Sequence, residues 1–311
     1  MHTNYGVDQE NKFMVVGLKG INFFRLMDAK DCSFHYDRST LDIQPVTQAT
    51  IGRLSLAMGM QFDQWEIFGN EARKGFMGAL HHSLAFHPHS QLYVVTGKIA
   101  GTGEVTVTHK GSGPEKFLVA VLSSKSYDLA FNFLQCRNAS GKMISRTSWT
   151  PVDGQTMLDT LNRVYGPQTN ITFDLKSADW VKIEKDLGNP LSEASFRSNG
   201  VAQNNNGSAD LNLYFVDKWV RQGNSEKFGS YLPDLKVALL EDDLGFLPVT
   251  QGADPFAVLL AHEVAHFLQN AQVAEQGRGK ATGHVAGQNV LFCEDIESTK
   301  INRALVESIN H

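Results

Sequence analysis

The chain has 311 residues, of which 42% are hydrophobic and 20% are charged, and its formal net charge is −5. This composition is typical of a globular protein long enough for two domains, and it lacks the basic blocks or stripes that bind nucleic acid. No apolar run approaches the roughly 18 residues of a membrane-spanning helix, so no transmembrane segment is expected. The polar start, MHTNYGVDQENKF, has no signal-peptide core.

Three cysteines, Cys32, Cys136 and Cys293, are distributed over the whole chain. They are too few and too scattered for a disulfide framework or for a cysteine-based zinc site. We therefore expect three buried small side chains.

Residues 10–125 are predicted to be a β-rich domain, because short alternating segments are separated by turn residues. The segments are TLDIQPV (40–46), RLSLAM (53–58), QLYVVTG (91–97), EVTVTH (104–109) and KFLVAVL (116–122). The run from Tyr93 to Leu122 resembles the closing strands of bacterial immunoglobulin-like domains. This resemblance implies an all-β, sandwich-like domain, and the pairing of such a module with the domain that follows favours an exported bacterial protein.

Two features interrupt this β-rich region. WEIFGNEARKGFMGALHH (65–82) is predicted to be a short helix or a long insertion. The segment 81–89 holds four of the eleven histidines. It is either a second metal site or a polar loop around Pro88, and the loop is favoured because no carboxylate or cysteine stands at a ligand-like spacing.

Residues 126–311 follow a different pattern, in which strands and helices are mixed. Strands are predicted at 128–135, 170–175, 211–216 and 236–242, and a polar loop at 188–210. A helix capped by Asp153 would bury Met157, Leu158, Leu161, Val164 and Tyr165, and a terminal helix at 298–310 would bury Ile301, Leu305 and Ile309. This order predicts an α/β or α+β domain with a mixed, twisted sheet packed on helices.

The most informative segment is His262-Glu263-Val264-Ala265-His266, an H-E-x-x-H motif. Asp254 and Pro255 are suited to the start of a helix, and apolar residues recur after them at helical spacing. Two histidines four apart lie on one helix face, so both imidazoles can bind one Zn²⁺ ion. Glu263 could then act on a water molecule bound to the same metal.

The order of elements in residues 126–311 resembles the metzincin zinc metallopeptidases. The resemblance rests on LNRVYG followed by NITFDL, on LNLYFV, on LLAHEVAHFLQ, and on GHVAGQNVLF followed by STKINRALVES. It implies a zincin-type protease fold, a peptide or protein substrate bound as an extended strand along a sheet edge, and LNLYFV as that edge. The chain departs from the family pattern at Gln269, Gln272 and Leu291, where a glycine, a histidine and a methionine are usual.

The third zinc ligand is open to two interpretations. A helix that runs on to Gln276 and a turn at residues 277–279 would let the chain return, so that His284 completes a three-histidine site, which we favour. Alternatively Glu294, within the acidic run Glu294, Asp295 and Glu297, would complete a His-His-Glu site as in thermolysin-like peptidases. The acidic run has a second interpretation as the first turn of the last helix, where negative charge interacts favourably with the helix dipole.

The predicted function is therefore that of a zinc-dependent endopeptidase, with His262, His266 and His284 as metal ligands and Glu263 as general base. Three alternatives remain: a thermolysin-like His-His-Glu hydrolase, a zinc hydrolase of a non-peptide amide or ester, and an inert zinc-containing binding module. The β-rich domain would serve attachment, spacing or substrate delivery, or would simply support the protease domain.

Overall fold

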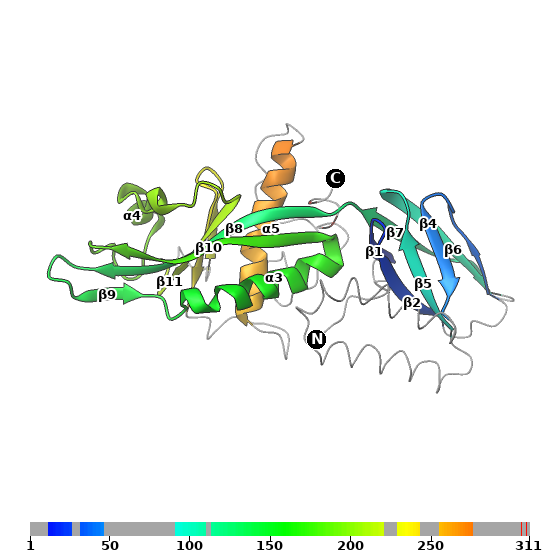
Figure 1. Ribbon diagram of the computed structural model, residues 1–311, viewed down its shortest axis with the longest axis horizontal. Helices are drawn as coiled ribbons and strands as arrows, with labels where there is room; N and C mark the ends of the chain where they lie inside the picture. The colour runs from blue at the N-terminus through cyan, green and yellow to red at the C-terminus, as the bar shows by residue number, and fades with distance from the viewer. Residues whose placement is uncertain are drawn as a thin grey trace. The chain divides into compact units, whose positions relative to one another are not determined.

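The computed structural model describes residues 12–26, 32–46, 91–109, 113–220, 229–242 and 255–275, together with Val306 and Ile309. The chain divides into two units, shown in Figure 1. One holds Ser126–Val164 and Ile171–His311, and the other holds His2–Lys125 and Tyr165–Asn170. The predicted strand at 53–58, the insertion at 65–82, the histidine cluster at 81–89 and Cys293 lie outside the described residues.

The unit that contains the first strands is a pair of β-sheets. One sheet has the order β1-β7-β6-β3 and the other the order β2-β5-β4, and β1 runs parallel to β7 whereas the other pairs are antiparallel. The strands are β1 (Phe13–Gly17), β2 (Ile21–Leu26), β3 (Cys32–His35), β4 (Leu41–Pro45), β5 (Gln91–Gly97), β6 (Gly101–His109) and β7 (Glu115–Leu122). The strands predicted at 40–46, 91–97, 104–109 and 116–122 are thereby confirmed.

Buried and exposed side chains alternate along these strands, so the two sheets share one hydrophobic core. Val105 and Val107 of β6 are buried while Glu104 is exposed, which is the pattern of a strand with one solvated face. The ring of Phe24 in β2 stacks on that of Tyr93 in β5, with centroids 5.4 Å apart, and meets that of Phe117 in β7 edge-on, with centroids 5.3 Å apart. The aromatic side chains of the two sheets therefore interdigitate.

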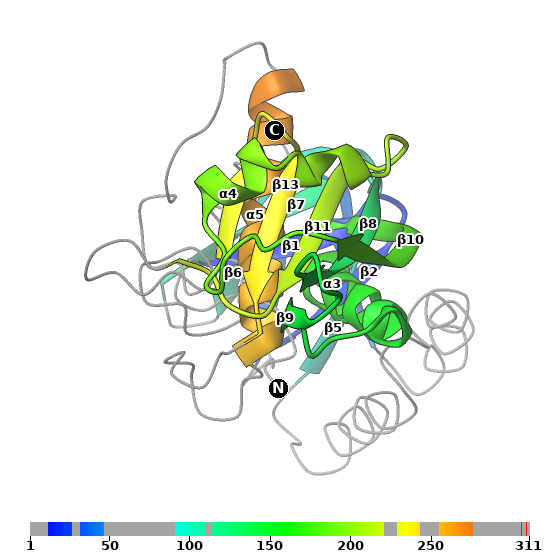
Figure 2. The ribbon, with the colours of Figure 1, turned by 90° about the vertical axis from the view of Figure 1, so that its left-hand side faces the viewer.

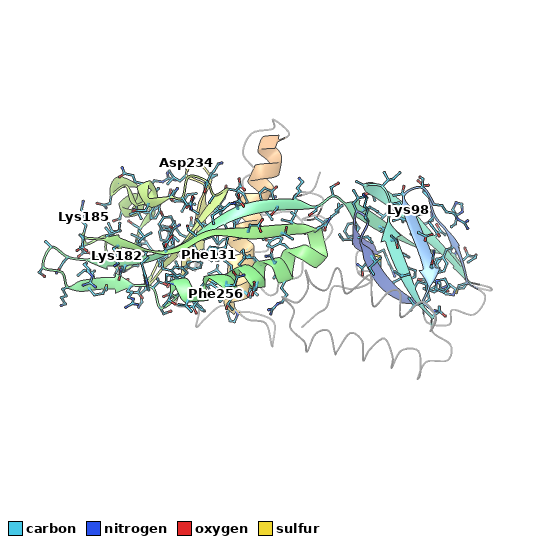
Figure 3. The ribbon with its side chains drawn as sticks, viewed as in Figure 1. Lys98, Phe131, Lys182, Lys185, Asp234 and Phe256 are labelled. Carbon is cyan, nitrogen blue, oxygen red and sulfur yellow. The ribbon has the colours of Figure 1, made fainter. Side chains whose placement is uncertain are left out.

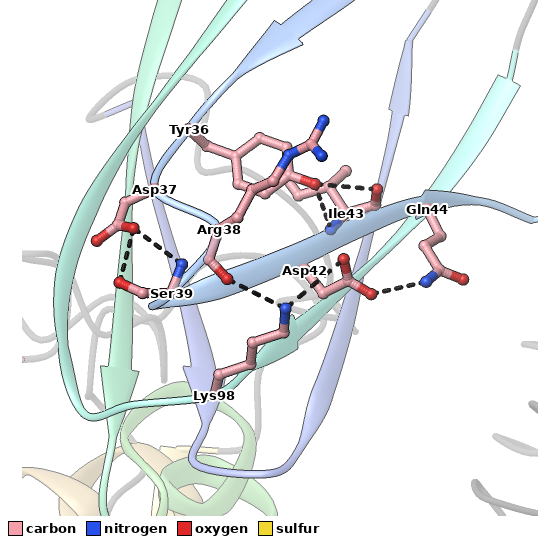
Figure 4. Close-up of polar contacts among 8 residues, drawn as sticks. All are labelled: Tyr36, Asp37, Arg38, Ser39, Asp42, Ile43, Gln44 and Lys98. Carbon is pink, nitrogen blue, oxygen red and sulfur yellow. Dashed lines mark hydrogen bonds and ion pairs between the residues drawn. The ribbon is translucent and has the colours of Figure 1, made fainter.

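Polar contacts shape the connection between β3 and β4, where the chain passes from one sheet to the other (Figure 4). The Asp37 carboxylate accepts hydrogen bonds from the amide and hydroxyl of Ser39 at 2.8 and 2.7 Å, and these bonds lower the pKa of Asp37. The Tyr36 hydroxyl accepts from the Ile43 amide at 3.2 Å, which ties the end of β3 to the middle of β4. The Lys98 ammonium donates to the Arg38 carbonyl at 3.1 Å.

The other unit is built on a mixed sheet of order β10-β8-β11-β13-β12, with β9 paired to β8. β8, β11 and β13 are parallel, and β12 joins β13 antiparallel. The strands are β8 (Lys125–Arg137), β9 (Met143–Arg146), β10 (Ile171–Ile183), β11 (Leu211–Val216), β12 (Gly229–Leu232) and β13 (Val237–Glu241). The four strands predicted in this region are confirmed, and β9 and β12 are additions.

The position expected for LNLYFV in the sheet was wrong. This segment is β11, which lies between β8 and β13 and is buried at all six residues. A strand that pairs on both sides and is covered on both faces is continuously apolar, and this explains its composition. Among the described strands, the edge beyond β13 is β12.

One face of the mixed sheet packs against α3 (Gly154–Thr169) and α5 (Pro255–Glu275). Phe131 of β8, labelled in Figure 3 together with Phe256 of α5, meets Phe215 of β11 edge-on, with ring centroids 5.7 Å apart. The ring centroid of Phe256 lies 6.1 Å from that of Phe215 and 4.3 Å from that of Trp149. These rings fill the layer between the sheet and α5, which fixes the start of that helix under the central strands.

α3 starts at Gly154, directly after the predicted capping residue Asp153, but the residue that caps this segment is not the predicted one. A short 3₁₀ turn, η2 (Pro151–Asp153), precedes the helix. The Asp153 carboxylate accepts hydrogen bonds from the amide and hydroxyl of Thr150, both at 2.8 Å. Thr150 is therefore the capping residue and Asp153 the third residue of the capping box. The predicted buried stripe is confirmed at Met157, Leu158, Leu161, Val164 and Tyr165.

The opposite face of the sheet is covered by part of the segment 188–210, which the sequence predicts as a polar loop (Figure 2). That prediction was wrong in part, because the segment forms α4 (Glu193–Ser198) and η3 (Val201–Asn204). Phe196 and Val201 are fully buried, and Phe196 meets Tyr214 of β11 edge-on at 5.1 Å. The Tyr214 hydroxyl donates to the Val201 carbonyl at 3.2 Å, so the aromatic side chain anchors this cover through both its ring and its polar end.

We expect Phe196→Ala to lower the free energy of unfolding by about 3–5 kcal/mol, because it opens a cavity under β11. Val152→Ala is the matched control, since Val152 is 88% exposed and its truncation should change stability by less than about 0.5 kcal/mol. Denaturant titration of both variants checks this. Equal stability of the two variants would show that the segment 188–210 does not cover the sheet.

Candidate functional site

The H-E-x-x-H motif lies in the middle of α5, a helix buried on almost every side. The predicted helix is confirmed: Val258, Leu260, Val264 and Ala265 are fully buried, and the described helix starts at the predicted Pro255. A single helix that is apolar around its circumference belongs to an interior. No helix in the described part of the chain is both long enough and apolar enough to cross a membrane.

The two histidines of the motif converge on one point. Their Nε2 atoms are 3.2 Å apart, and the ring planes stand at 84° with centroids 4.8 Å apart. Two nitrogens each about 2.0–2.1 Å from one tetrahedral zinc ion would be about 3.3 Å apart. The pair therefore fits two adjacent positions of a zinc site, and in the metal-free protein one Nε2–H can donate to the other.

Burial differs between the members of the motif. His262 and Glu263 are 5% and 4% exposed, whereas His266 is half-buried. Histidines at positions one before and three after Glu263 lie about 60–100° to one side of it on the helix, because each residue turns the helix by about 100°. The imidazole pair and the carboxylate thus occupy neighbouring stripes of the same helix turn.

The Glu263 side chain packs against the edge strand β12. A Cβ atom placed on Gly229 would lie 2.4 Å from Glu263 Oε1 and 2.8 Å from its Cδ. Two residues further along β12, the ring of Tyr231 meets Phe267 of α5 edge-on at 6.5 Å. Burial and the nearby Asp234 carboxylate raise the pKa of Tyr231 to about 12, so this phenol keeps its proton at neutral pH.

Sequence reasoning missed β12 and both of these residues. GSYL is only four residues long, and it is too short to show an alternating pattern. Gly229 and Tyr231 belong to the site because the sheet pairing places them over α5, and this contact leaves no signal in the local sequence.

The helix continues beyond the motif, which bears on the third ligand. It passes through Gln269 and Gln272, the positions at which metzincins carry a glycine and the third histidine, and it is described as far as Glu275. A residue six positions after His266 is about 9 Å further along the axis, so position 272 cannot approach the histidine pair. No glycine ends the helix at position 269, so the helix carries Gln272 away from the histidine pair.

Both candidates for the third ligand, His284 and Glu294, lie outside the described residues, as do Asp295 and Glu297. In the described part of the chain, no three side chains of His, Cys, Asp or Glu gather at ligand distance. Of the terminal helix, Val306 and Ile309 are described, and both are helical and buried, which confirms the predicted burial of Ile309.

Two of the three cysteines, Cys136 and Cys32, are described. Cys136 is buried in the core between the sheet and α4, as predicted. The prediction was wrong for Cys32, which is half-buried at the start of β3, with its Sγ 3.0 Å from Nδ1 of His109 on the paired strand β6.

Comparison with known proteins adds little to this geometry. No protein-family model matches the chain, and no curated protein matches it. Among solved structures, the chain is similar to the one titled "Solution Structure of Amebosin", at 10% sequence identity and a TM-score of 0.20 over 37% of this chain and 93% of that chain.

Proposed function

We propose that the protein is a zinc-dependent endopeptidase whose active site is the middle turn of α5. The observation that carries this proposal is the convergence of His262 Nε2 and His266 Nε2 to 3.2 Å, with a buried glutamate between them in the chain. A purely structural zinc site would close with a fourth protein ligand and would not need Glu263. We propose His284 as the third ligand, with Glu294 as the alternative.

Each residue of the motif would have a separate task. His262 and His266 would hold Zn²⁺ as neutral imidazoles. A zinc ion held there would supply a water molecule of lowered pKa and would polarise the scissile carbonyl. Glu263 would accept a proton from the attacking water at a carboxylate oxygen as the new C–O bond forms. It would then give that proton to the amide nitrogen as the C–N bond breaks, so the carboxylate ends the reaction in the form in which it began.

The resemblance to metzincins implies that the substrate binds as an extended strand along the sheet edge above the active helix. With β11 in the centre of the sheet, β12 is the strand that fits this role. It is antiparallel to β13, and its helix-facing side chains meet α5 at Phe267. Main-chain pairing along β12 would hold the peptide beside the histidine pair, while side-chain pockets would set specificity.

For the other unit we propose an immunoglobulin-like module. The two sheet orders support this, because strands lettered A to G in chain order give the sets AGFC and BED, close to the CFG and ABED sheets of immunoglobulin constant domains. Such a module would serve attachment, spacing, substrate delivery or support. Its pairing with a protease favours an exported bacterial protein.

Digestion of a broad peptide library by the purified full chain tests the proposed activity. We expect cleavage with zinc present, loss of cleavage on chelation, and recovery when zinc is added back. Zinc-loaded protein that cleaves no peptide would contradict the endopeptidase proposal. Turnover of non-peptide amides or esters under the same conditions would favour that class of substrate instead, and zinc binding without any hydrolysis would favour a binding module.

A further inference from the structure

The contact between Gly229 and Glu263 carries an inference that rests on the proposed function. The two residues are far apart in the chain, yet the backbone of β12 lies directly against the Glu263 side chain. A Cβ atom at position 229 would be 2.4 Å from Oε1, 2.8 Å from Cδ and 2.9 Å from Cγ of Glu263. All three distances are shorter than real Cβ contacts, so any side chain at 229 would force the glutamate to move.

Space, and not backbone conformation, requires glycine at this position. Among the described glycines, those with positive φ are Gly101, Gly141, Gly188 and Gly200, and Gly229 has an ordinary extended backbone within β12. Any other residue could adopt this extended backbone, and glycine destabilises a strand relative to such a residue. A glycine inside a strand therefore marks the close approach of another group. In β12 that group is the proposed general base.

The way in which β12 packs on α5 places Gly229 opposite Glu263. Side chains of a strand alternate, so Gly229 and Tyr231 face α5. Glu263 and Phe267 are four residues apart on α5, and Tyr231 meets Phe267 while Gly229 meets Glu263. Two consecutive helix-facing positions of the strand thus oppose two consecutive turns of the helix. The position without a side chain is the one that opposes the carboxylate.

We infer that Gly229 is a positioning residue, which sets the place of the Glu263 carboxylate by leaving room for it beneath the edge strand. Its effect on the reaction would pass through Glu263 alone. His262 and His266 lie on a neighbouring stripe of the helix, and the three atoms nearest to the Cβ position all belong to Glu263. The metal ligands should therefore keep their geometry when residue 229 is changed.

The test uses Gly229→Ala in the full chain, with Gly207→Ala as the matched control. A Cβ on Gly207 meets nothing within 4 Å, so the control makes the same chemical change in open space. We expect Gly229→Ala to lower kcat about 100-fold with little change in KM and with full zinc content, since a displacement of about 1 Å can cost that much. Gly207→Ala should match the wild type.

Rescue separates positioning from general damage. Glu263→Asp shortens the side chain by one methylene, so it should remove most of the clash with the methyl group that Gly229→Ala adds. We expect Gly229→Ala to cost far less than about 100-fold in kcat when it is introduced into Glu263→Asp. An equal loss in both backgrounds would overturn the inference.

Thermal unfolding of the metal-free proteins gives a readout that is independent of activity. Gly229→Ala should lower Tm by a few degrees in the wild type but not in Glu263→Ala, where the clashing atoms are absent. The same Tm shift in both backgrounds would overturn the inference. An active wild type with an unaffected Gly229→Ala variant would overturn the positioning role alone, whereas an inactive wild type would overturn the proposed function and this role with it.

Discussion

Replacing Glu263 with glutamine is expected to lower kcat by up to about 10⁴-fold, the upper range for the loss of a general acid–base group. Glutamine has nearly the same shape, so it fits beneath Gly229 where the carboxylate lies. It cannot accept the proton of the attacking water. Because both imidazoles remain, zinc content should stay close to that of the wild type. Glu263→Ala should likewise abolish hydrolysis and leave most of the zinc bound.

Peptide hydrolysis and zinc content, measured on the same preparations, check this result. Glu193→Gln is the control, since Glu193 lies on α4 on the other side of the sheet and pairs with Arg197 at 2.7 Å on the surface. That ion pair contributes little to stability, so the control should retain full activity. A Glu263→Gln enzyme with wild-type kcat would remove Glu263 from the reaction and, with it, the main argument for a catalytic zinc site.

His284→Ala is expected to reduce the zinc content sharply, whereas Glu294→Ala should leave it unchanged. Loss of an outer hydrogen-bond partner of a zinc ligand costs about 10–100-fold in metal affinity, and loss of a ligand itself should cost more. His35→Ala is a suitable control, because His35 is an exposed histidine at the end of β3.

Metal analysis after dialysis against a weak chelator distinguishes the two candidate ligands. The reverse pattern, in which Glu294→Ala loses zinc and His284→Ala keeps it, would place the protein in the His-His-Glu class. Zinc retained by both single variants would mean that neither residue is the third ligand. In each case His262→Ala should lose the metal, because one imidazole of the converging pair is gone.

Local patterns of the sequence were enough for much of the fold. Strands such as 91–97 and 211–216 were predicted to the residue, and the buried stripe of α3 followed from its helical spacing. The approach of the two histidines also follows from a local sequence pattern. A spacing of four residues in a helix determines that two side chains lie one turn apart, so the sequence was sufficient to predict that His262 and His266 meet.

Other features depend on contacts between residues that are distant in the chain. The composition of LNLYFV predicts a buried strand, but its place in the centre of the sheet comes from pairing with β8 and β13. The segment 188–210 is mostly polar, and its few apolar residues show no period over so short a helix. Phe196 and Val201 are buried because Tyr214 of β11 lies beneath them, and a local pattern does not record that contact.

The candidate site combines both kinds of information. Residues 262–266 carry the ligands and the proposed base, and helix geometry alone brings them to one face. The room that the carboxylate occupies comes from Gly229, which stands 34 positions earlier in the chain on a strand of four residues. The residue opposite Glu263 is determined by the pairing register of β12 with β13 and by the packing of β12 on α5. Register and packing follow from the burial of whole surfaces, so only the folded chain determines this contact.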